Sequence, residues 1–558
     1  MSSRLYRGSK GSSHALPSVV PCKGASLRSS GRLLARCTAT TMAATCSTGT
    51  RSYHGESWSK PHSHRFTSVA STTWSSNDLS TDKPQAISSF DDAVVQYVGW
   101  YGDPVASVEQ AIAADPDFVM GHIFKAGLHL FSTGEPHGSD AIQGSVAKAR
   151  ASKTGPQTER ERMHLEAVEA WANGESLGEA ARIWNLILDR YPRDELALKF
   201  ANDAHFFLGE SKGIRDSVQK VLPSWSNTSE MPLYGYALGM WSFGLEEMHQ
   251  YDKAEKAGQE ALQINRNDPW AVHALAHVYE MRGQSEHGIR FLESTKKDWA
   301  WCTALGCHLW WHLALYHVEH GRFDEAIHLY DDRISKMATS GSMLDLVDVA
   351  SLLQRLTMEG VDVGKRWEEI LPLWEPHVED HLLAFNDVHL AMTAGGAHRK
   401  DISSHLLNSL HNWVNNNNSI NNNPQRTNFK VTSQVGIPLC KAFLHYHDGH
   451  FRAVMESFLP ILEATDLQKV NDKSNILLIG GSHAQRDVFW QLLLRSIAAA
   501  LKEERQPHQH QQKDLGRREG ERELMERMER VAVQLLAARK AARPNSLVTK
   551  RLEAAFRA

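Results

Sequence analysis

Apolar residues recur along most of this chain at the spacing of an amphipathic α-helix. From Phe90 onward they lie three or four positions apart, and glycines occur where the periodic stretches stop. Runs in which apolar and polar residues alternate, which would indicate β-strands, are lacking. The pattern therefore predicts an all-α protein.

Two segments break the helical pattern. VNNNNSINNNPQRTN, which spans Val414–Asn428, is rich in asparagine, and EERQPHQHQQKDLGRREGERE, which spans Glu503–Glu523, is polar and highly charged. Such compositions are typical of solvated insertions. We expect a loop in the first segment, and a linker or a helix extension in the second.

Four stretches of the helical pattern align as copies of one helical hairpin. Each copy turns at a residue that we number position 15, and it has a small residue at position 8, where paired helices approach closely. Position 15 is Gly209, His249, Gly283 and Gly321, and position 8 is Asn202, Ser242, Ala276 and Ala314. Successive copies start 40, 34 and 38 residues apart, measured at position 4, which is Leu198, Leu238, Val272 and Trp310.

These spacings indicate degenerate tetratricopeptide repeats, whose standard length is about 34 residues. One hairpin cannot bury its apolar face alone, so stacked neighbours make the core. The predicted fold is a superhelix of degenerate tetratricopeptide-type helical hairpins, with the first helix of each hairpin on the concave side. Further hairpins are expected to end near Gly134, Gly174, Gly360, Gly396 and Gly449.

Residues 1–82 form a basic extension, and residues 83–558 are predicted to be a single helical-repeat domain. Residues 1–80 contain ten Lys and Arg against two acidic residues, and they are rich in Ser and Thr. This composition predicts a mitochondrial transit peptide, with Arg51-Ser52-Tyr53 as the expected processing site. A disordered terminus and a true start at Met42 are the alternatives, and the protein would then be cytoplasmic.

The charge and the cysteines exclude several classes of partner and site. The whole chain has a net charge of −4, and residues 1–80 carry +8, so the remainder carries −4 − 8 = −12. An acidic body repels phosphate backbones, so we expect no nucleic-acid partner. No run of 18 apolar residues occurs, so no membrane span is expected. The six cysteines show neither a paired framework nor a zinc-type spacing.

The stretch WAVHALAHVYEMRG carries the main candidate chemistry. It places His273, His277 and Glu280 at i, i+4 and i+7, on one face of a helix. In the repeat numbering these are positions 5, 9 and 12, which face the concave groove. The next copy adds His308 and His312, although His312 at position 6 is expected to turn partly away. Because these residues are predicted to face an open groove, we expect His273→Ala to cost under about 1 kcal/mol of stability.

These five residues are also the candidate metal ligands. Two imidazoles at i, i+4 with a carboxylate suit zinc or iron, so a metal cofactor is possible but is not determined by the sequence. The sequence HALAH lacks the glutamate of the HExxH metalloprotease helix, and no nucleophile with an adjacent base is visible. No catalytic residue is therefore assigned.

Other side chains are expected to complete a polar, aromatic-lined groove. The pattern favours a helical-repeat protein that binds a peptide or a small ligand there; the alternative is an enzyme, metal-dependent or metal-free, with a His/Glu-rich site in the same groove. A clamp for chaperone C-terminal tails is not expected, because Glu246 and Glu247 make the groove acidic. Asp345 and Asp348 are expected to form a structural ion pair with Arg355. The further groove candidates are Lys199, Asp203, Trp270, Trp311, Asn386, Asp387, His389, Arg486 and Asp487.

Several long segments closely resemble the tetratricopeptide repeat protein 38 family. The resemblance runs from about Phe90 to the C-terminus, outside the two insertions. It implies an all-α repeat fold and no particular biochemical activity. The matching segments are DPDFVMGHI (Asp115–Ile123), LALKFANDAHFFLG (Leu196–Gly209), DPWAVHALAHVYEM (Asp268–Met281), CHLWWHLALY (Cys307–Tyr316), FNDVHLAM (Phe385–Met392) and GGSHAQRDVF (Gly480–Phe489).

Overall fold

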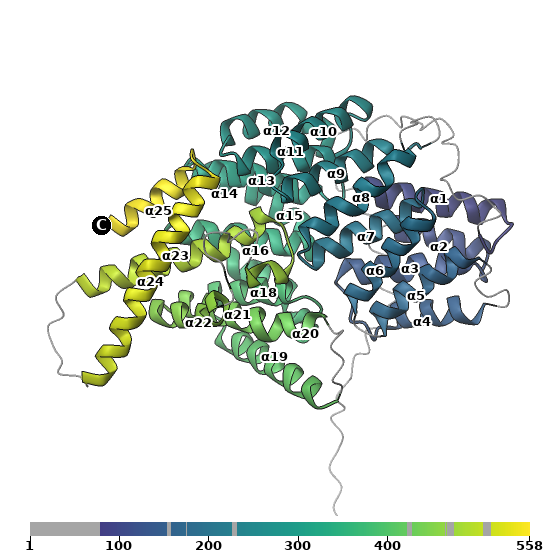
Figure 1. Ribbon diagram of the computed structural model, residues 1–558. Helices are drawn as coiled ribbons and strands as arrows, with labels where there is room; N and C mark the ends of the chain where they lie inside the picture. Colours follow the sequence, from purple (N-terminus) through teal and green to yellow (C-terminus); the bar gives the residue numbers. More distant parts are fainter. Residues whose placement is uncertain are drawn as a thin grey trace, which may run out of the picture. The chain divides into compact units, whose positions relative to one another are not determined.

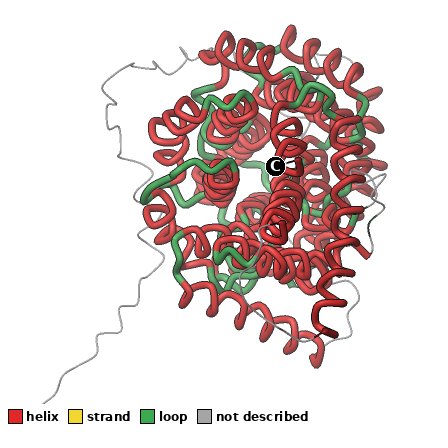
Figure 2. The backbone as a smooth tube through the Cα atoms, turned by 90° about the vertical axis from the view of Figure 1, so that its left-hand side faces the viewer, coloured by secondary structure: helices red, strands yellow, loops and turns green. Residues whose placement is uncertain are grey.

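The computed structural model describes residues 79–152, 158–173, 176–225, 231–420, 427–463, 465, 474–505 and 515–557, although not the side chains of 417–420, 427 and 515–518. Within these ranges the chain consists of helices and the loops between them, without a strand (Figure 2). The expected transit peptide and its processing site at Tyr53 lie outside the described residues. Contacts divide the chain into Met1–Ser59 and Lys60–Ala558, and everything below concerns the second unit.

The helices form consecutive hairpins, which Figure 1 shows in chain order. The fold is an all-α helical-repeat superhelix, as the hydrophobic pattern predicts. The paired helices are α1 (Pro84–Gly99) with α2 (Pro104–Ala114), α3 (Val119–Ser132) with α4 (Asp140–Ala151), α5 (Glu159–Ala172) with α6 (Leu177–Arg190), α7 (Glu195–Phe207) with α8 (Ser211–Trp225), α9 (Tyr234–Glu247) with α10 (Tyr251–Ile264), α11 (Pro269–Met281) with α12 (Ser285–Trp299), α13 (Gly306–Glu319) with α14 (Phe323–Leu329), α16 (Met343–Met358) with α17 (Arg366–Trp374), α18 (Ala384–Gly396) with α19 (Lys400–Ile420), and α21 (Ile437–His447) with α22 (Phe451–Glu463).

Three longer or terminal helices, α23 (His483–Arg505), α24 (Leu515–Ala542) and α25 (Leu547–Arg557), complete the described chain. The remaining elements are short: α15 (Ser335–Ala338), α20 (Thr427–Val431), the π-helical segments Tyr330–Ile334 and Thr432–Gly436, and the 3-10 helices Glu375–His377 and Asn475–Ile479. Tyr330–Ile334 joins α14 to α15, and Thr432–Gly436 joins α20 to α21, without a break in the helix. Among the residues that the structure describes, no helix is long and apolar enough to span a membrane.

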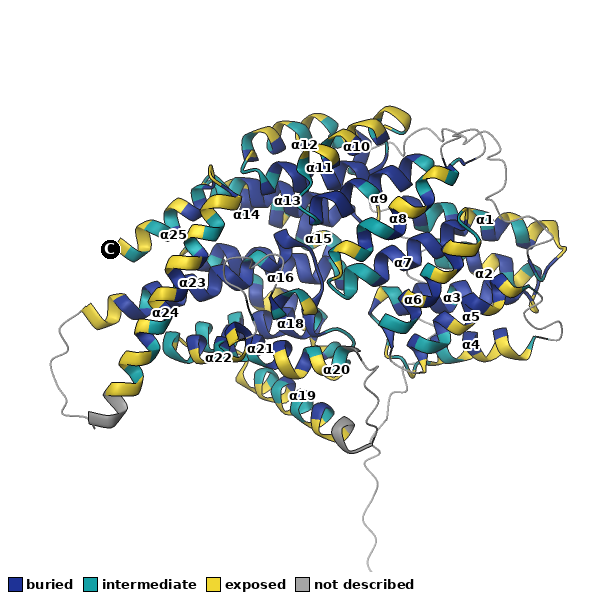
Figure 3. Cartoon of the chain, viewed as in Figure 1, coloured by how far each residue is buried: buried dark blue, intermediate teal, exposed yellow. Residues whose placement is uncertain are grey.

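The turn within each of the four aligned hairpins is left-handed, as the repeat alignment predicts. Gly209, His249, Gly283 and Gly321 have φ angles of 68°, 57°, 66° and 69°. Such angles let the chain leave one helix and reverse into the next, and glycine adopts them at the lowest cost. The first helices of these hairpins, α7, α9, α11 and α13, are almost entirely buried (Figure 3). Their partner helices α8, α10 and α12 bury one face only.

The Asn-rich segment is only partly a loop. Helix α19 continues to Ile420, so Val414–Ile420 is helical, and the prediction of a loop from Val414 is wrong there. The apolar periodicity of α19 extends into the segment, because Val414 is buried in the core and Trp413 packs against it. In the charged segment, Glu503–Arg505 ends α23 and Leu515–Glu523 begins α24, so both described parts extend helices.

Two sets of long-range contacts narrow the concave side of the hairpins, and the groove that remains opens to solvent beside the exposed residues Gly102, Ser132, Thr303 and Ser342. At one side, the end of α1 packs against α11 and the loop before α13. The Trp270 indole N–H donates to the Val98 carbonyl at 3.0 Å, and the Cys302 thiol donates to the Trp100 carbonyl at 2.8 Å.

The second set of contacts comes from the segment that precedes α23. It crosses the end of α7 so closely that a Cβ atom on Gly209 would lie 1.8 Å from the Leu477 carbonyl oxygen. The backbone N–H of His483 donates to Oε1 of Glu247 at 2.9 Å, which joins this segment to α9. These contacts connect residues far apart in sequence, and the space that remains is a cavity that is partly open to solvent.

Candidate functional site

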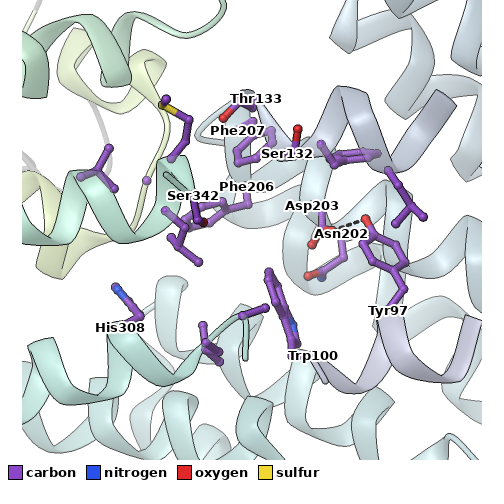
Figure 4. Close-up of a pocket in the computed structure, with 18 of the residues that line it drawn as sticks. Tyr97, Trp100, Ser132, Thr133, Asn202, Asp203, Phe206, Phe207, His308 and Ser342 are labelled. Atoms are coloured by element: carbon purple, nitrogen blue, oxygen red, sulfur yellow. Dashed lines mark hydrogen bonds between the residues drawn. The ribbon is translucent and has the colours of Figure 1, made fainter. Parts of the chain in front are cut away.

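The remaining space is a partly open cavity of about 340 Å³ between the inner helices α1, α3, α7, α9, α11, α13, α16 and α18 (Figure 4). Most of its wall is aromatic or aliphatic. Asp203 is the one carboxylate among the residues that line it, and no Lys or Arg is among them. The aromatic wall consists of Tyr97, Trp100, Tyr101, Phe131, Phe206, Phe207, Phe243, Trp270 and Phe385.

The Asp203 carboxylate is held by two buried partners. The Tyr97 hydroxyl donates to its Oδ2 at 2.7 Å (Figure 4), and Lys199, one helical turn earlier, forms an ion pair with the same oxygen. The Lys199 ammonium lies 4.4, 4.3 and 5.1 Å from the ring centroids of Tyr97, Trp100 and Trp270. Burial lowers the pKa of Lys199, whereas Asp203 opposes that shift. The site therefore presents an oriented acceptor whose charge is already compensated.

Four histidines meet behind one wall of this cavity. His273 and His277 come from α11, and His308 and His312 come from α13; all four are buried, and His273 and His308 also line the cavity. Their ring centroids are between 4.4 and 6.4 Å apart. Nε2 of His277 lies 2.9 Å from Nε2 of His273. One ring nitrogen from each histidine lies within 4.8 Å of those of the other three.

Three carboxylates face the outer sides of these rings. Both Asp348 oxygens, from α16, lie 2.9 Å from Nδ1 of His308. Glu280 Oε2 lies 3.1 Å from Nδ1 of His312, and Glu246 Oε2 lies 3.5 Å from Nδ1 of His277. Each carboxylate occupies the Nδ1 side, which turns the Nε2 side of the ring towards the other histidines.

Burial dominates the pKa shifts of the cluster. It lowers the pKa of His273, His277 and His312 well below the usual value, and neighbouring imidazoles lower it further. Burial also raises the pKa of Glu246 well above its usual value, helped by Glu247 and Glu280. It raises the pKa of Glu280 and Asp348, although Arg543 and His308 respectively oppose these shifts. Neutral forms of these groups are therefore favoured.

Five predicted groove residues line the cavity: Asp203, Trp270, His273, His308 and Asn386. His277 lies in the histidine cluster, with Glu280 at its edge, and Lys199 lies behind the aromatic wall. His312 does not turn away as expected, because its ring packs against that of His277, with the two ring centroids 4.5 Å apart. His273 is only 5% exposed, so the argument for a small cost of His273→Ala loses its basis.

Five further predicted groove residues lie away from the cavity wall. Trp311 is fully buried and stacks on His308 at 4.9 Å, and His389 Nδ1 lies 2.7 Å from the Phe385 carbonyl oxygen. Burial lowers the pKa of His389 to about 4. Asp387 lies 3.2 Å from Nδ1 of His381.

Arg486 and Asp487 connect parts of the fold. Arg486 donates to the carbonyl oxygens of Gly480 and Gly481 and lies 3.3 Å from Glu247, so it holds the segment that precedes α23. Asp487 pairs with Arg539 of α24. Both residues therefore stabilise the fold.

Asp345 and Asp348 do not form the predicted ion pair with Arg355, and the Ser340 hydroxyl instead donates to Asp345 at 3.3 Å. Asp348 faces His308, and Arg355 donates to the Ser351 carbonyl at 3.2 Å and to the Ala484 carbonyl at 2.8 Å, so the predicted ion pair is wrong. Asp348 and Arg355 are seven residues apart on one helix, but packing turns them to different neighbours. The sequence does contain a signal that places Glu246 near the histidines. Glu246 occupies position 12 of the α9 copy, and Glu280 occupies the same position in the next copy.

No family model matches the chain. Solved structures that resemble it include the human IFIT1 dimer with PPP-AAAA, at 14% identity and a TM-score of 0.28, over 68% of this chain and 94% of that one. The TPR domain of P58(IPK) matches at 12% identity and a TM-score of 0.16, over 65% of this chain and 98% of that one. Likenesses this low carry no argument, so the architecture rests on the helical hairpins of the chain itself.

Proposed function

We propose that this chain is a helical-repeat binding protein whose ligand is a small organic molecule, apolar over most of its surface. The observation that carries the proposal is the cavity of about 340 Å³ with its aromatic wall. Sites for small molecules have volumes of about 300–1,000 Å³, mostly apolar linings and a few placed polar groups. Within the described chain, this cavity combines all three properties.

The polar groups of the cavity indicate how the ligand would be oriented. Asp203 can accept a hydrogen bond, and its charge is compensated by Lys199, so a neutral donor on the ligand suits it better than a full positive charge. Asn386 at another part of the wall donates to the Thr133 hydroxyl at 3.3 Å and keeps its amide oxygen as a further acceptor. A ligand with hydroxyl or amine donors on an apolar body fits both.

The narrowing of the concave side favours a small molecule over a peptide. An extended peptide advances by about 3.3 Å per residue and needs an open groove along which to lie. Here the Trp270–Val98 contact and the segment across Gly209 narrow the concave side, which leaves less room for such a chain. We therefore narrow the ligand to a compact molecule.

A pair of matched variants tests the proposal. Val347 is 4% exposed and lines the cavity, whereas Val533 on α24 is 68% exposed, so Val347→Phe fills the cavity and Val533→Phe adds the same ring outside it. A library of small apolar alcohols, amines and metabolites is screened by thermal shift, and bound molecules are sought by native mass spectrometry. A true ligand at 100 times its Kd stabilises the wild-type chain by about 2.7 kcal/mol.

We expect that stabilisation to be lost in Val347→Phe and retained in Val533→Phe. Equal stabilisation of both variants would place the ligand elsewhere. A folded wild-type chain that binds no library compound but binds extended peptides would overturn the proposal.

We also propose that the chain is a member of the tetratricopeptide repeat protein 38 family, on the segments quoted above, and that residues 1–82 direct it to mitochondria. The acidic body supports the absence of a nucleic-acid partner, because it would repel phosphates. Glu246 and Glu247 at the C-terminal end of α9 likewise disfavour a clamp for acidic chaperone tails.

A further inference from the structure

We infer that His273, His277, His308 and His312 bind one divalent transition-metal ion of the zinc class. Four imidazoles placed tetrahedrally around one ion, at the usual zinc–nitrogen distance of about 2.0–2.1 Å, hold their ring centroids about 5 Å apart. The six centroid separations here are 4.4, 4.9, 5.3, 6.4, 4.5 and 4.6 Å, which bracket that value. The site goes beyond the proposed ligand cavity and does not depend on it.

The carboxylates determine which ring nitrogens face the centre. An ionised carboxylate next to Nδ1 selects the tautomer that carries the proton there, and Nε2 then presents a lone pair. Asp348 and Glu280 lie within hydrogen-bond distance of Nδ1 of His308 and His312, and Glu246 lies 3.5 Å from Nδ1 of His277 without a hydrogen bond. Histidines that ligate metals are oriented in the same way, with a carboxylate or carbonyl on the outer nitrogen.

The inner nitrogens do not satisfy one another by hydrogen bonds. Nε2 of His312, on the inner side of its ring, is buried and has no hydrogen-bond partner. The one contact between inner nitrogens, at 2.9 Å between His273 and His277, can use only one proton. Buried polar atoms are rarely left unpaired, because each costs about 1–3 kcal/mol. A cation at the centre would satisfy all four lone pairs together.

The charges around the cluster also suit a divalent cation. Glu246, Glu280 and Asp348 face the rings, and Arg543 of α24 lies 3.7 Å from Glu280. Burial by itself raises the pKa of these carboxyl groups and lowers that of three of the histidines, and a central cation would reverse both tendencies.

The donor set identifies the class of metal. Four imidazole nitrogens suit zinc, copper, nickel, cobalt and iron, whereas calcium and magnesium take oxygen ligands. Four protein ligands without an open position are typical of a structural zinc site. Such an ion would join α11 to α13 and hold His273 and His308 in the cavity wall.

Metal analysis of the untagged full-length chain, purified without chelators, tests the inference. We expect about one equivalent of a divalent transition metal, or its uptake after incubation with Zn²⁺ or Co²⁺ and desalting. The cobalt form should show the intense visible absorption of a tetrahedral site. A folded chain that retains no metal after this treatment would overturn the inference.

Matched variants locate the ion. His277→Ala/His312→Ala should abolish metal retention, whereas His389→Ala, which removes another buried histidine of an inner helix, should retain it. Retention by the double variant would place the ion elsewhere and overturn the assignment.

Variants of the outer carboxylates keep the test decisive if the double variant fails to fold. Asp348→Asn should weaken metal affinity about 10- to 100-fold, as the loss of such a partner does in known sites. Asp387→Asn changes a second buried Asp–His pair, with His381, and should leave the affinity unchanged. Equal affinities of the two variants, measured by chelator competition, would contradict the geometry.

Discussion

Lys199 and Asp203 form a buried ion pair beside the cavity, and a double-mutant cycle measures what that pair contributes. Lys199 is fully buried, and its ammonium contacts three aromatic rings. Lys199→Met keeps the apolar stem and removes the charge, so Asp203 is left with the Tyr97 hydroxyl as its partner. Asp203→Asn keeps an acceptor for that hydroxyl while it removes the carboxylate charge.

The structure sets the expected magnitudes. Removal of one partner from a buried pair costs about 3–5 kcal/mol, because the other charge is left uncompensated. Asp203 borders the cavity, so we expect Lys199→Met to cost about 3 kcal/mol. The double variant Lys199→Met/Asp203→Asn buries no lone charge and should lie within about 1–2 kcal/mol of the wild type. The coupling energy should therefore be at least about 1 kcal/mol.

Lys212 and Asp216 provide the matched control. They form an ion pair with the same i, i+4 spacing, but the Lys212 side chain is 75% exposed. Solvent screens such pairs, so Lys212→Met should cost under about 1 kcal/mol.

Urea denaturation is followed by far-UV circular dichroism and by tryptophan fluorescence, because Trp100 and Trp270 lie beside Lys199 and a repeat protein need not unfold in one step. Equal costs for Lys199→Met and Lys212→Met, or a double variant less stable than Lys199→Met, would refute the reasoning.

Three further predictions follow from single residues. Gly209→Ala and Gly321→Ala both place a side chain at positive φ, which should cost each variant about 1–2 kcal/mol of stability. Only the Gly209→Ala side chain also meets the Leu477 carbonyl, so this variant should show the larger fall in melting temperature. Equal falls would contradict the close approach of the Leu477 segment to α7. Burial raises the pKa of Asp268 to about 8, so between pH 4 and 8 the folded chain holds a proton that the unfolded chain has released. The stability of the wild type relative to Asp268→Asn should therefore fall as the pH rises through this range, by up to about 1.4 kcal/mol per pH unit. Parallel pH profiles of the two chains in urea melts would disprove this. The mature N-terminus should lie near Tyr53, and N-terminal sequencing that finds residue 1 or Met42 instead would exclude mitochondrial processing.

Local periodicity was enough to predict the hairpins and part of the site. The 3.6-residue repeat of apolar positions predicts helices, and a residue at position 15 that tolerates positive φ predicts each turn, as Gly209 and His249 show. The same geometry places His273 beside His277, because residues four apart share a helix face whatever lies around them. The Asn-rich segment was predicted less well, since the packing of Val414 outweighs the weak helix propensity of asparagine.

The sequence by itself determined that this chain is an array of helical hairpins with two histidine pairs on inner helices, because those properties depend on residues within one or two turns of each other. The tertiary structure decided that the pairs on α11 and α13 face one another, that Asp348, 40 residues beyond His308, lies against its ring, and that long-range contacts narrow the groove. Such contacts depend on how whole helices pack. The bond from Trp270 to Val98 spans 172 residues, and no local pattern specifies it.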